Sequence, residues 1–192
     1  MSELAWIAAG RKLIGTIENT SKTSHNPVVT AMWESIEKAT GKSLDWLFAQ
    51  GLKNLHNKND EVAWCGGFVG ACLARAGRHI VPNPFRASAW NDYREMTQLT
   101  KPCYGCIVTF TRDGGGHVGF VVGKDKAGNL MVLGGNQSNK VSIIPFAVSR
   151  ATGYFFPSRV DAKGNAIKAF PVASRYDLPL LKSNGQVSTN EA

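Results

Sequence analysis

Residues 60–69 read Asp-Glu-Val-Ala-Trp-Cys-Gly-Gly-Phe-Val, and residues 114–123 read Gly-Gly-Gly-His-Val-Gly-Phe-Val-Val-Gly. The first stretch passes from polar residues into an apolar run, which predicts a helix that begins at Cys65. In the second stretch, His117 opens a run typical of a β-strand. A helix N-terminus carries partial positive charge and unpaired N–H groups, which favour a thiolate over a thiol. Cys65 and His117 are therefore the expected nucleophile and base of a cysteine hydrolase.

Helical patterns occupy the chain before this histidine. Ser2 is expected to cap a first helix, Asn26 to cap a second that starts at Pro27 and ends before Gly41, and Ser88 to cap a short helix with Trp90 and Tyr93. The expected helices span residues 2–14, 27–39, 44–48, 65–76 and a short stretch after 88.

From Gly105 onward the apolar residues recur with a period of two. The candidate strands are residues 106–111, 117–123, 130–133, 140–144 and 153–156, with glycine-rich turns between them. Helices followed by an antiparallel β-meander predict an α+β fold. We expect residues 1–160 to form the catalytic domain and residues 161–192 to form a partly flexible C-terminal extension, because the periodicity fades there.

Composition describes a globular chain with a basic surface. Of 192 residues, 43% are hydrophobic and 19% are charged, and the net charge of +8 corresponds to a pI of about 9.5. Such a charge favours an anionic partner, either nucleic acid, an anionic membrane surface or an anionic cell-wall polymer. The chain has no cluster of five Lys or Arg residues interleaved with aromatics, so specific nucleic-acid recognition is not supported.

The N-terminus places Glu3 before the first apolar stretch and Arg11 and Lys12 after it, which is the reverse of a signal peptide. No run approaches the roughly 18 apolar residues of a transmembrane helix. We therefore expect synthesis in the cytoplasm, a monomeric protein, and action in the periplasm or cell wall after release. Four cysteines in such a chain do not suggest a disulfide framework.

Several blocks together resemble CHAP-type amidohydrolase/peptidases. They are Trp64-Cys65, Pro102-x-x-Gly105-x-Ile107-Val108, residues 116–123, residues 133–139 (Leu-Gly-Gly-Asn-Gln-Ser-Asn) and residues 24–27 (Ser-His-Asn-Pro). The resemblance covers about residues 3–157 and is greatest to the small single-domain branch found in phage lysins. It implies a papain-like fold, cleavage of an amide bond in bacterial peptidoglycan, and no metal or organic cofactor.

The logic of a catalytic triad requires a third residue, and the strand expected to pair with that of His117 ends at Asn136. Asn136 is expected to accept a hydrogen bond from the imidazole, with Gln137, Asp60 and Glu61 as alternatives. Many CHAP relatives carry a glutamate just before this asparagine, where this chain has Gly134-Gly135.

Substrate contacts are expected from three residues, Trp64, Gly66 and Gln137. Gly66-Gly67 would cost stability at the start of a helix, and we expect this pair to let the substrate approach the backbone.

Other cysteines and histidines are alternatives to this pair. Cys72 is expected to be a packing residue two helical turns beyond Cys65. Cys103 and Cys106 form a C-x-x-C pair, for which a structural role is favoured over zinc or redox chemistry because a second ligand pair is missing. The remaining histidines, which lack a strand context, are His25, His56 and His79.

The expected function is a phage endolysin that acts as an N-acetylmuramoyl-L-alanine amidase or a stem-peptide endopeptidase. The alternatives are an antibacterial effector with the same chemistry, a non-catalytic basic binding or virion protein, and a small zinc or redox protein.

Overall fold

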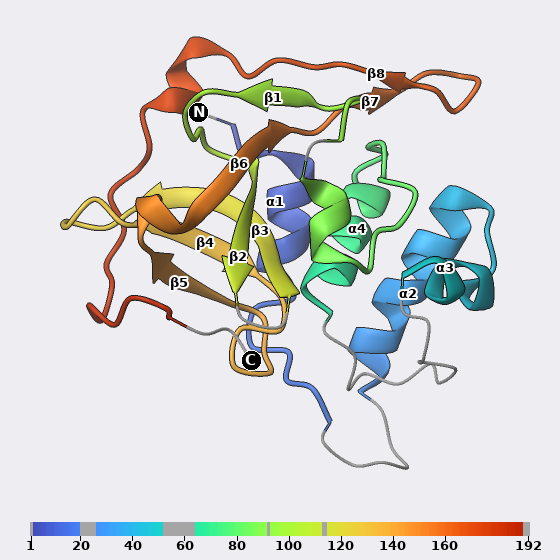
Figure 1. Cartoon of the computed structure of the whole chain (residues 1–192), viewed down its shortest axis with the longest axis horizontal. Helices are drawn as coiled ribbons and strands as arrows, with labels where there is room; N and C mark the ends of the chain where they lie inside the picture. The colour runs from blue at the N-terminus through green and yellow to red at the C-terminus, as the bar shows by residue number, and fades with distance from the viewer. Residues whose placement is uncertain (1, 20–25, 52–63, 92, 113–114, 190–192) are drawn as a thin grey trace.

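The computed structural model describes residues 2–19, 26–51, 64–91, 93–112 and 115–189. It forms an α+β fold in which helices pack against an antiparallel six-stranded sheet (Figure 1). Helix α4 (Cys65–Arg75) contacts both the sheet and α1 (Ala5–Arg11). Helix α2 (Pro27–Thr40) covers another side of α4, and α3 (Leu44–Gly51) packs beside α2. The predicted class of helices followed by an antiparallel sheet is confirmed.

Local capping signals set the helix ends where the prediction succeeded. The Asn26 side chain accepts a hydrogen bond from the Val28 N–H at 2.8 Å, and Pro27 is the first helical residue. Gly41 ends α2 in the left-handed region, with φ 65°, where a side chain would be strained.

Two predicted caps are wrong. Leu4, not Ser2, precedes α1, so this helix is shorter than expected at both ends. Ser88 lies inside a 3₁₀ helix, η1 (Ala87–Trp90), whose N-cap is Arg86. Neither Leu4 nor Arg86 makes a side-chain capping hydrogen bond, so tertiary contacts rather than caps set these helix starts.

The sheet has the strand order β1-β6-β2-β3-β4-β5. Its strands are β1 (Thr97–Leu99), β2 (Ile107–Arg112), β3 (Gly115–Lys124), β4 (Leu130–Gly134), β5 (Ser142–Phe146) and β6 (Ala151–Phe156). Strands β2 to β5 form the predicted meander, whereas β6 follows the 3₁₀ helix η2 (Val148–Arg150) and crosses back to pair with β2. The short strand β1, which pairs with β6, was not expected.

The first nine residues of α4 are buried, because glycines let neighbours approach its backbone. A β-carbon at Gly66 would lie 2.3 Å from the carbonyl oxygen of Pro84, and one at Gly67 would lie 2.2 Å from the Trp33 ring. We expected this glycine pair to make room for the substrate. That expectation is wrong for the space beside the two α-carbons. That space is filled by the protein's own core.

The C-terminal segment returns along the sheet. Strand β7 (Arg159–Val160) pairs with β8 (Ala166–Ile167), and the 3₁₀ helix η3 (Ala173–Tyr176) follows. Farther on, the Leu181 N–H donates to the Lys124 carbonyl at 2.8 Å, and the Ser188 N–H donates to the Pro145 carbonyl at 2.8 Å. Figure 1 shows the segment after β8 running from the β7–β8 hairpin to the side of β5. The domain boundary near residue 160 stays a prediction.

The packing of Gly66 predicts the effect of one added methyl group. Gly66→Ala should lower the free energy of unfolding by about 1–3 kcal/mol, because the fixed Pro84 carbonyl also accepts a hydrogen bond from the Trp90 indole N–H at 2.9 Å. Thermal or urea denaturation measures the change. Gly115→Ala is the matched control, since a β-carbon there would have nothing within 4 Å. Equal stability of the two variants would contradict this account.

Candidate active site

Cys65 is the first residue of α4, as predicted, and its side chain is buried at 2% exposure. No side chain caps this helix start, because its N-cap residue is Trp64. Backbone N–H groups in the first turn of a helix point away from the helix's own carbonyls and attract negative charge. The position therefore suits a thiolate nucleophile.

His117 lies near the start of β3, opposite Phe110 in the β2–β3 pair. Its ring stacks on the Phe146 ring, with centroids 5.4 Å apart and an interplanar angle of 4°. Phe110 in turn stacks on Phe146 at 4.5 Å. The imidazole is 1% exposed, so packing against β5 sets the plane in which its two nitrogens lie.

The backbone of Gly134 and Gly135 lies near both His117 and the first turn of α4. A β-carbon on Gly134 would lie 3.2 Å from His117 Nε2. One on Gly135 would lie 2.5 Å from the Phe68 β-carbon and 2.7 Å from the Trp64 ring. Consecutive α-carbons are about 3.8 Å apart, so the first turn of α4 and the imidazole lie against the same two-residue segment. The helix turn that begins with Cys65 and the His117 imidazole therefore adjoin the same segment of the chain.

Gln137, and not Asn136, contacts the imidazole. Gln137 Oε1 lies 3.3 Å from His117 Nε2, a long hydrogen bond. The Gln137 amide nitrogen donates to the Ser142 carbonyl at 2.8 Å and contacts the Ser142 hydroxyl at 3.0 Å. Because a carbonyl only accepts, this contact identifies the amide nitrogen and leaves the oxygen facing the ring.

Asn136 was expected to orient the histidine, but this hydrogen bond is not seen in the structure, and a catalytic role for Asn136 stays a prediction. Its Oδ1 is buried with no hydrogen-bond partner among the described residues. The backbone is left-handed here, with φ 54° at Asn136, 54° at Ser138 and 58° at Asn139. This turn follows β4, and within it the Gln137 side chain lies against Ser142. Such strain in non-glycine residues concentrates at functional sites.

The absent acid of the family has a steric explanation. No side chain fits at Gly135, because Phe68 and Trp64 occupy the space, and a side chain at Gly134 would collide with Gln137 Oε1 at 2.7 Å. The alternatives Asp60 and Glu61 lie outside the described residues, as do His25 and His56. Among the described residues, Gln137 offers His117 a hydrogen-bond acceptor.

The three residues predicted to contact substrate, Trp64, Gly66 and Gln137, lie in different surroundings. Trp64 is fully buried and its indole N–H donates to Glu18 at 2.9 Å, so this ring supports α4 from inside. Glu18 was missed because the contact joins residues far apart in the chain. The α-carbon of Gly66 packs against Pro84, so its backbone N–H is the group that could bind a substrate. This role stays a prediction, as does a substrate contact by Gln137.

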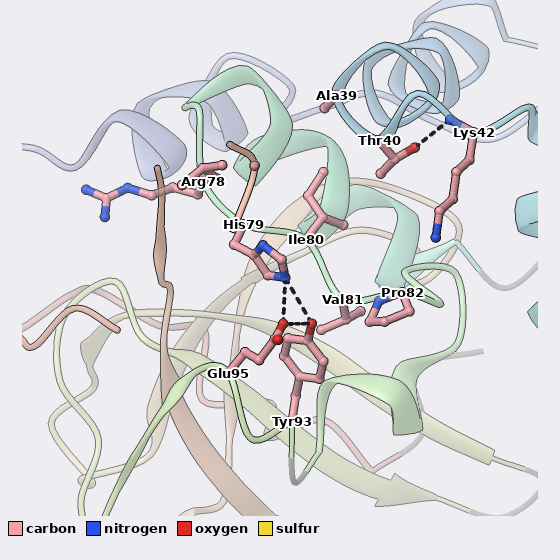
Figure 2. A pocket seen from close by; sticks show the side chains of 12 residues that line it. Ala39, Thr40, Lys42, Arg78, His79, Ile80, Val81, Pro82, Tyr93 and Glu95 are labelled. Carbon is pink, nitrogen blue, oxygen red and sulfur yellow. Dashed lines mark hydrogen bonds and ion pairs between the residues drawn. The ribbon is translucent and has the colours of Figure 1, made fainter. Parts of the chain in front are cut away.

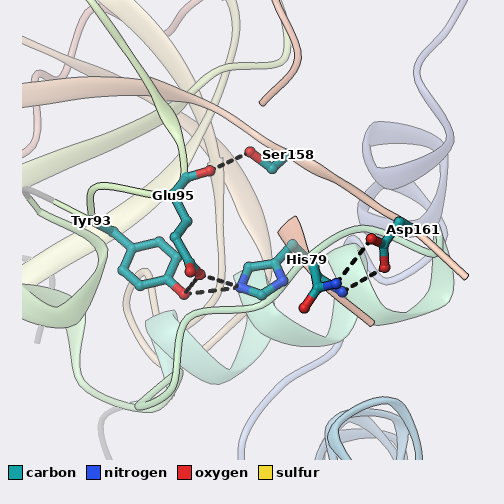
Figure 3. A network of polar contacts seen from close by, with 6 residues as sticks. His79, Tyr93, Glu95, Ser158 and Asp161 are labelled. Carbon is teal, nitrogen blue, oxygen red and sulfur yellow. Dashed lines mark hydrogen bonds and ion pairs between the residues drawn. The ribbon is translucent and has the colours of Figure 1, made fainter. Parts of the chain in front are cut away.

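His79 belongs to a separate polar cluster beside a cavity of about 420 Å³ (Figure 2). Its Nε2 lies 2.9 Å from the Tyr93 hydroxyl and 3.1 Å from a Glu95 carboxylate oxygen. Tyr93 also donates to Glu95, and the Ser158 hydroxyl donates to the Glu95 backbone carbonyl (Figure 3). Burial, with the Glu95 hydrogen bond, raises the pKa of Tyr93. The described lining of this cavity contains no cysteine or serine.

The remaining cysteines occupy buried positions. Burial raises the pKa of the Cys72 thiol, in keeping with a packing role. The Cys103 N–H donates to Cys106 Sγ at 3.4 Å. A hydrogen bond with Cys106 lowers the pKa of Cys103, whereas burial raises that of Cys106. Both are fully buried, in a turn that leads into β2, and among the described residues no three His, Cys, Asp or Glu side chains are grouped to hold a metal ion.

Comparisons with known proteins gave a match to a protein family. Within the described residues no helix is both long and apolar enough to cross a bilayer. Neither curated proteins nor solved structures gave a match. The family model of the CHAP domain matches residues 57–136, which supports a cysteine-type amidase or peptidase that acts on peptidoglycan. The matched segment contains Cys65 on α4, His117 on β3 and the Gly134-Gly135 pair, and this part of the chain is similar to a CHAP domain.

Proposed function

We propose that the protein hydrolyses an amide bond of bacterial peptidoglycan with Cys65 as nucleophile and His117 as base. One observation carries the proposal: the first turn of the helix that begins at Cys65 and a histidine hydrogen bonded to an amide lie against the same glycine pair, in the segment that the CHAP model matches.

The Gln137 contact selects the histidine tautomer. Because Gln137 Oε1 can only accept, His117 must donate its Nε2–H, which leaves Nδ1 as the basic nitrogen. Nδ1 takes the Cys65 proton, and the thiolate attacks the carbonyl carbon of the substrate amide. The Cys65 backbone N–H supplies one donor to the developing oxyanion.

The intermediate collapses when the C–N bond breaks and His117 gives its proton to the leaving amine. This step leaves a thioester on Cys65. Water then attacks the thioester while His117 takes a proton from it, and the thiol departs to regenerate the enzyme with a carboxylic acid product. Gln137 stays hydrogen bonded through Nε2 in both half-reactions, so it acts as a positioning residue.

The biological setting follows from chemistry and charge. We propose an endolysin of a phage, a monomer made in the cytoplasm and released to the periplasm, where its basic surface keeps it near anionic envelope polymers. A secreted effector would use the same site. Zymography on purified cell wall separates both from a non-catalytic binding protein, and mass spectrometry of the fragments distinguishes cleavage next to muramic acid from cleavage within the stem peptide.

Removing either reacting group should abolish lysis. Cys65→Ala should lower the rate of wall hydrolysis by at least about 10³-fold, and His117→Ala should lose nearly as much because nucleophile and base act as a unit. Turbidity loss of purified walls measures the rate. Cys72→Ala is the control for a buried thiol and should stay active if folded. A folded Cys65→Ala protein with substantial activity would end the cysteine mechanism.

Gln137 should control the protonation of His117. In Gln137→Leu the Nε2–H loses its acceptor, so the Nδ1–H tautomer should gain population, and kcat should fall more than KM changes. Nitrogen NMR of the imidazole reports the tautomer directly. Asn136→Ala is the matched control, because its Oδ1 has no hydrogen-bond partner among the described residues. A shift in Asn136→Ala without one in Gln137→Leu would reverse the assignment.

Charge should act on wall binding and not on bond cleavage. With 22 basic and 14 acidic residues, attraction to intact walls should weaken as the Debye length falls from about 30 Å at 0.01 M salt to about 8 Å at 0.15 M. Hydrolysis of intact walls should therefore decrease along a salt series, whereas turnover of a soluble muropeptide should change far less. Equal loss on both substrates would show that salt acts on the site or on the fold.

A further inference from the structure

A second cavity, of about 360 Å³, lies at the other end of α4 from Cys65. Four basic side chains line it, and no carboxylate is among its described lining residues. The four are Arg78, Arg159, Lys168 and Arg175. In Figure 2 the Arg78 guanidinium extends away from His79 and Glu95, so the carboxylate of the polar cluster does not neutralise it.

The positive charges in this cavity are close enough to affect one another. Arg78 and Arg159 are joined by an antiparallel backbone bridge. Burial, and then the Arg159 charge, lower the pKa of Arg78. Within the described part of the chain, no Asp or Glu lies within ion-pair distance of Arg78, Arg159 or Lys168. A bound anion would relieve this repulsion, and arginine pairs match the oxygens of a phosphate group.

Apolar side chains adjoin the same cavity. The Arg78 guanidinium lies over the Trp6 ring, 4.7 Å from its centroid. Phe170 and Val172 also line the cavity and are 72% and 61% exposed. Large exposed apolar side chains beside uncompensated bases are typical of surfaces that bind the interface of an anionic membrane.

We propose that this cavity binds the phosphate headgroup of an anionic phospholipid, while Phe170 and Val172 enter the interfacial layer of the membrane. Arg78 and Arg159 contact the phosphate, and Lys168 adds attraction at the rim. The 11 residues of α4 separate this site from Cys65 by about 16 Å along the helix axis. Docking on a membrane therefore leaves the catalytic pair unoccupied.

Vesicle co-sedimentation tests the proposal with the full chain. The vesicles are phosphatidylcholine alone, or phosphatidylcholine with phosphatidylglycerol at a ratio of 3:1. Arg78→Gln/Arg159→Gln should bind the anionic vesicles about tenfold more weakly or worse. Lys38→Gln/Lys126→Gln removes the same charge from exposed positions elsewhere and should lose much less. Equal losses in the two double variants would overturn the proposal, because net charge alone would then explain binding.

A single exposed substitution covers the case in which the double variant fails to fold. Phe170→Ser should weaken vesicle binding several-fold, whereas Val148→Ser, at a 48% exposed position in η2, should not. Equal binding by Phe170→Ser and the wild type would contradict membrane insertion. Inorganic phosphate that saturates the cavity would shift the arginine NMR signals. If such shifts occur without a preference for anionic vesicles, the cavity binds a soluble phosphate and not a lipid.

These measurements are independent of wall hydrolysis. Cys65→Ala should bind anionic vesicles like the wild type, and Arg78→Gln/Arg159→Gln should still cleave a soluble muropeptide at the wild-type rate. Absence of wall hydrolysis by the wild type, with intact vesicle binding, would count against the proposed function alone. Loss of wall binding by the double arginine variant, with unchanged vesicle binding, would overturn the lipid site alone.

Discussion

The candidate site depends on how closely the first turn of α4 approaches its neighbours. On one flank Gly66 and Gly67 bring the helix onto Pro84 and Trp33, and on another Gly135 brings β4 onto Trp64 and Phe68. A single methyl group at Gly66, Gly67 or Gly135 would have to displace backbone or a buried ring. Protein interiors are packed too densely to absorb such a change without strain. Because these glycines have no side chains, the helix start that carries Cys65 can pack closely against the segment that precedes Gln137.

This close approach also determines which residue can orient the histidine. An acidic side chain in the 134–135 segment has no room, so the acceptor for His117 comes from beyond the strand end. The chain reaches that acceptor through a turn with Asn136, Ser138 and Asn139 in the left-handed region, which costs of the order of 1 kcal/mol or more per residue. The Gln137 hydrogen bonds to Ser142 and the β4–β5 pairing offset part of this cost. A neutral amide replaces the carboxylate, and it still defines one tautomer.

Sequence reasoning succeeded where the signal was local. Asn26-Pro27 and Gly41 mark the ends of α2 with the chemistry of their own side chains and backbone. Cys65 is the first residue of α4 and His117 lies near the start of β3, as their flanking patterns indicate. It failed where the deciding partner lies far along the chain. The Gly66-Gly67 pair was interpreted as a substrate channel because its partners, Trp33 and Pro84, cannot be inferred from the adjacent sequence. Asn136 was preferred to Gln137 because the choice depends on a left-handed turn and on a β5 residue.

The two ends of helix α4 lie beside two different charged sites, the candidate thiolate of Cys65 and the basic cavity. Its N-terminus, the positive end of the helix dipole, meets Cys65, where a single negative charge is stabilised over contact distances. Its C-terminus, the negative end, carries Arg75 in the last turn and is followed by Arg78; Arg75 donates to Ser35 at 3.1 Å, and Arg78 lines the basic cavity. Cations at a helix C-terminus are favoured, so α4 partly offsets the repulsion between Arg78 and Arg159. The same helix can thus support a thiolate at one end and an anion-binding surface at the other, and the two charges stay too far apart to compete.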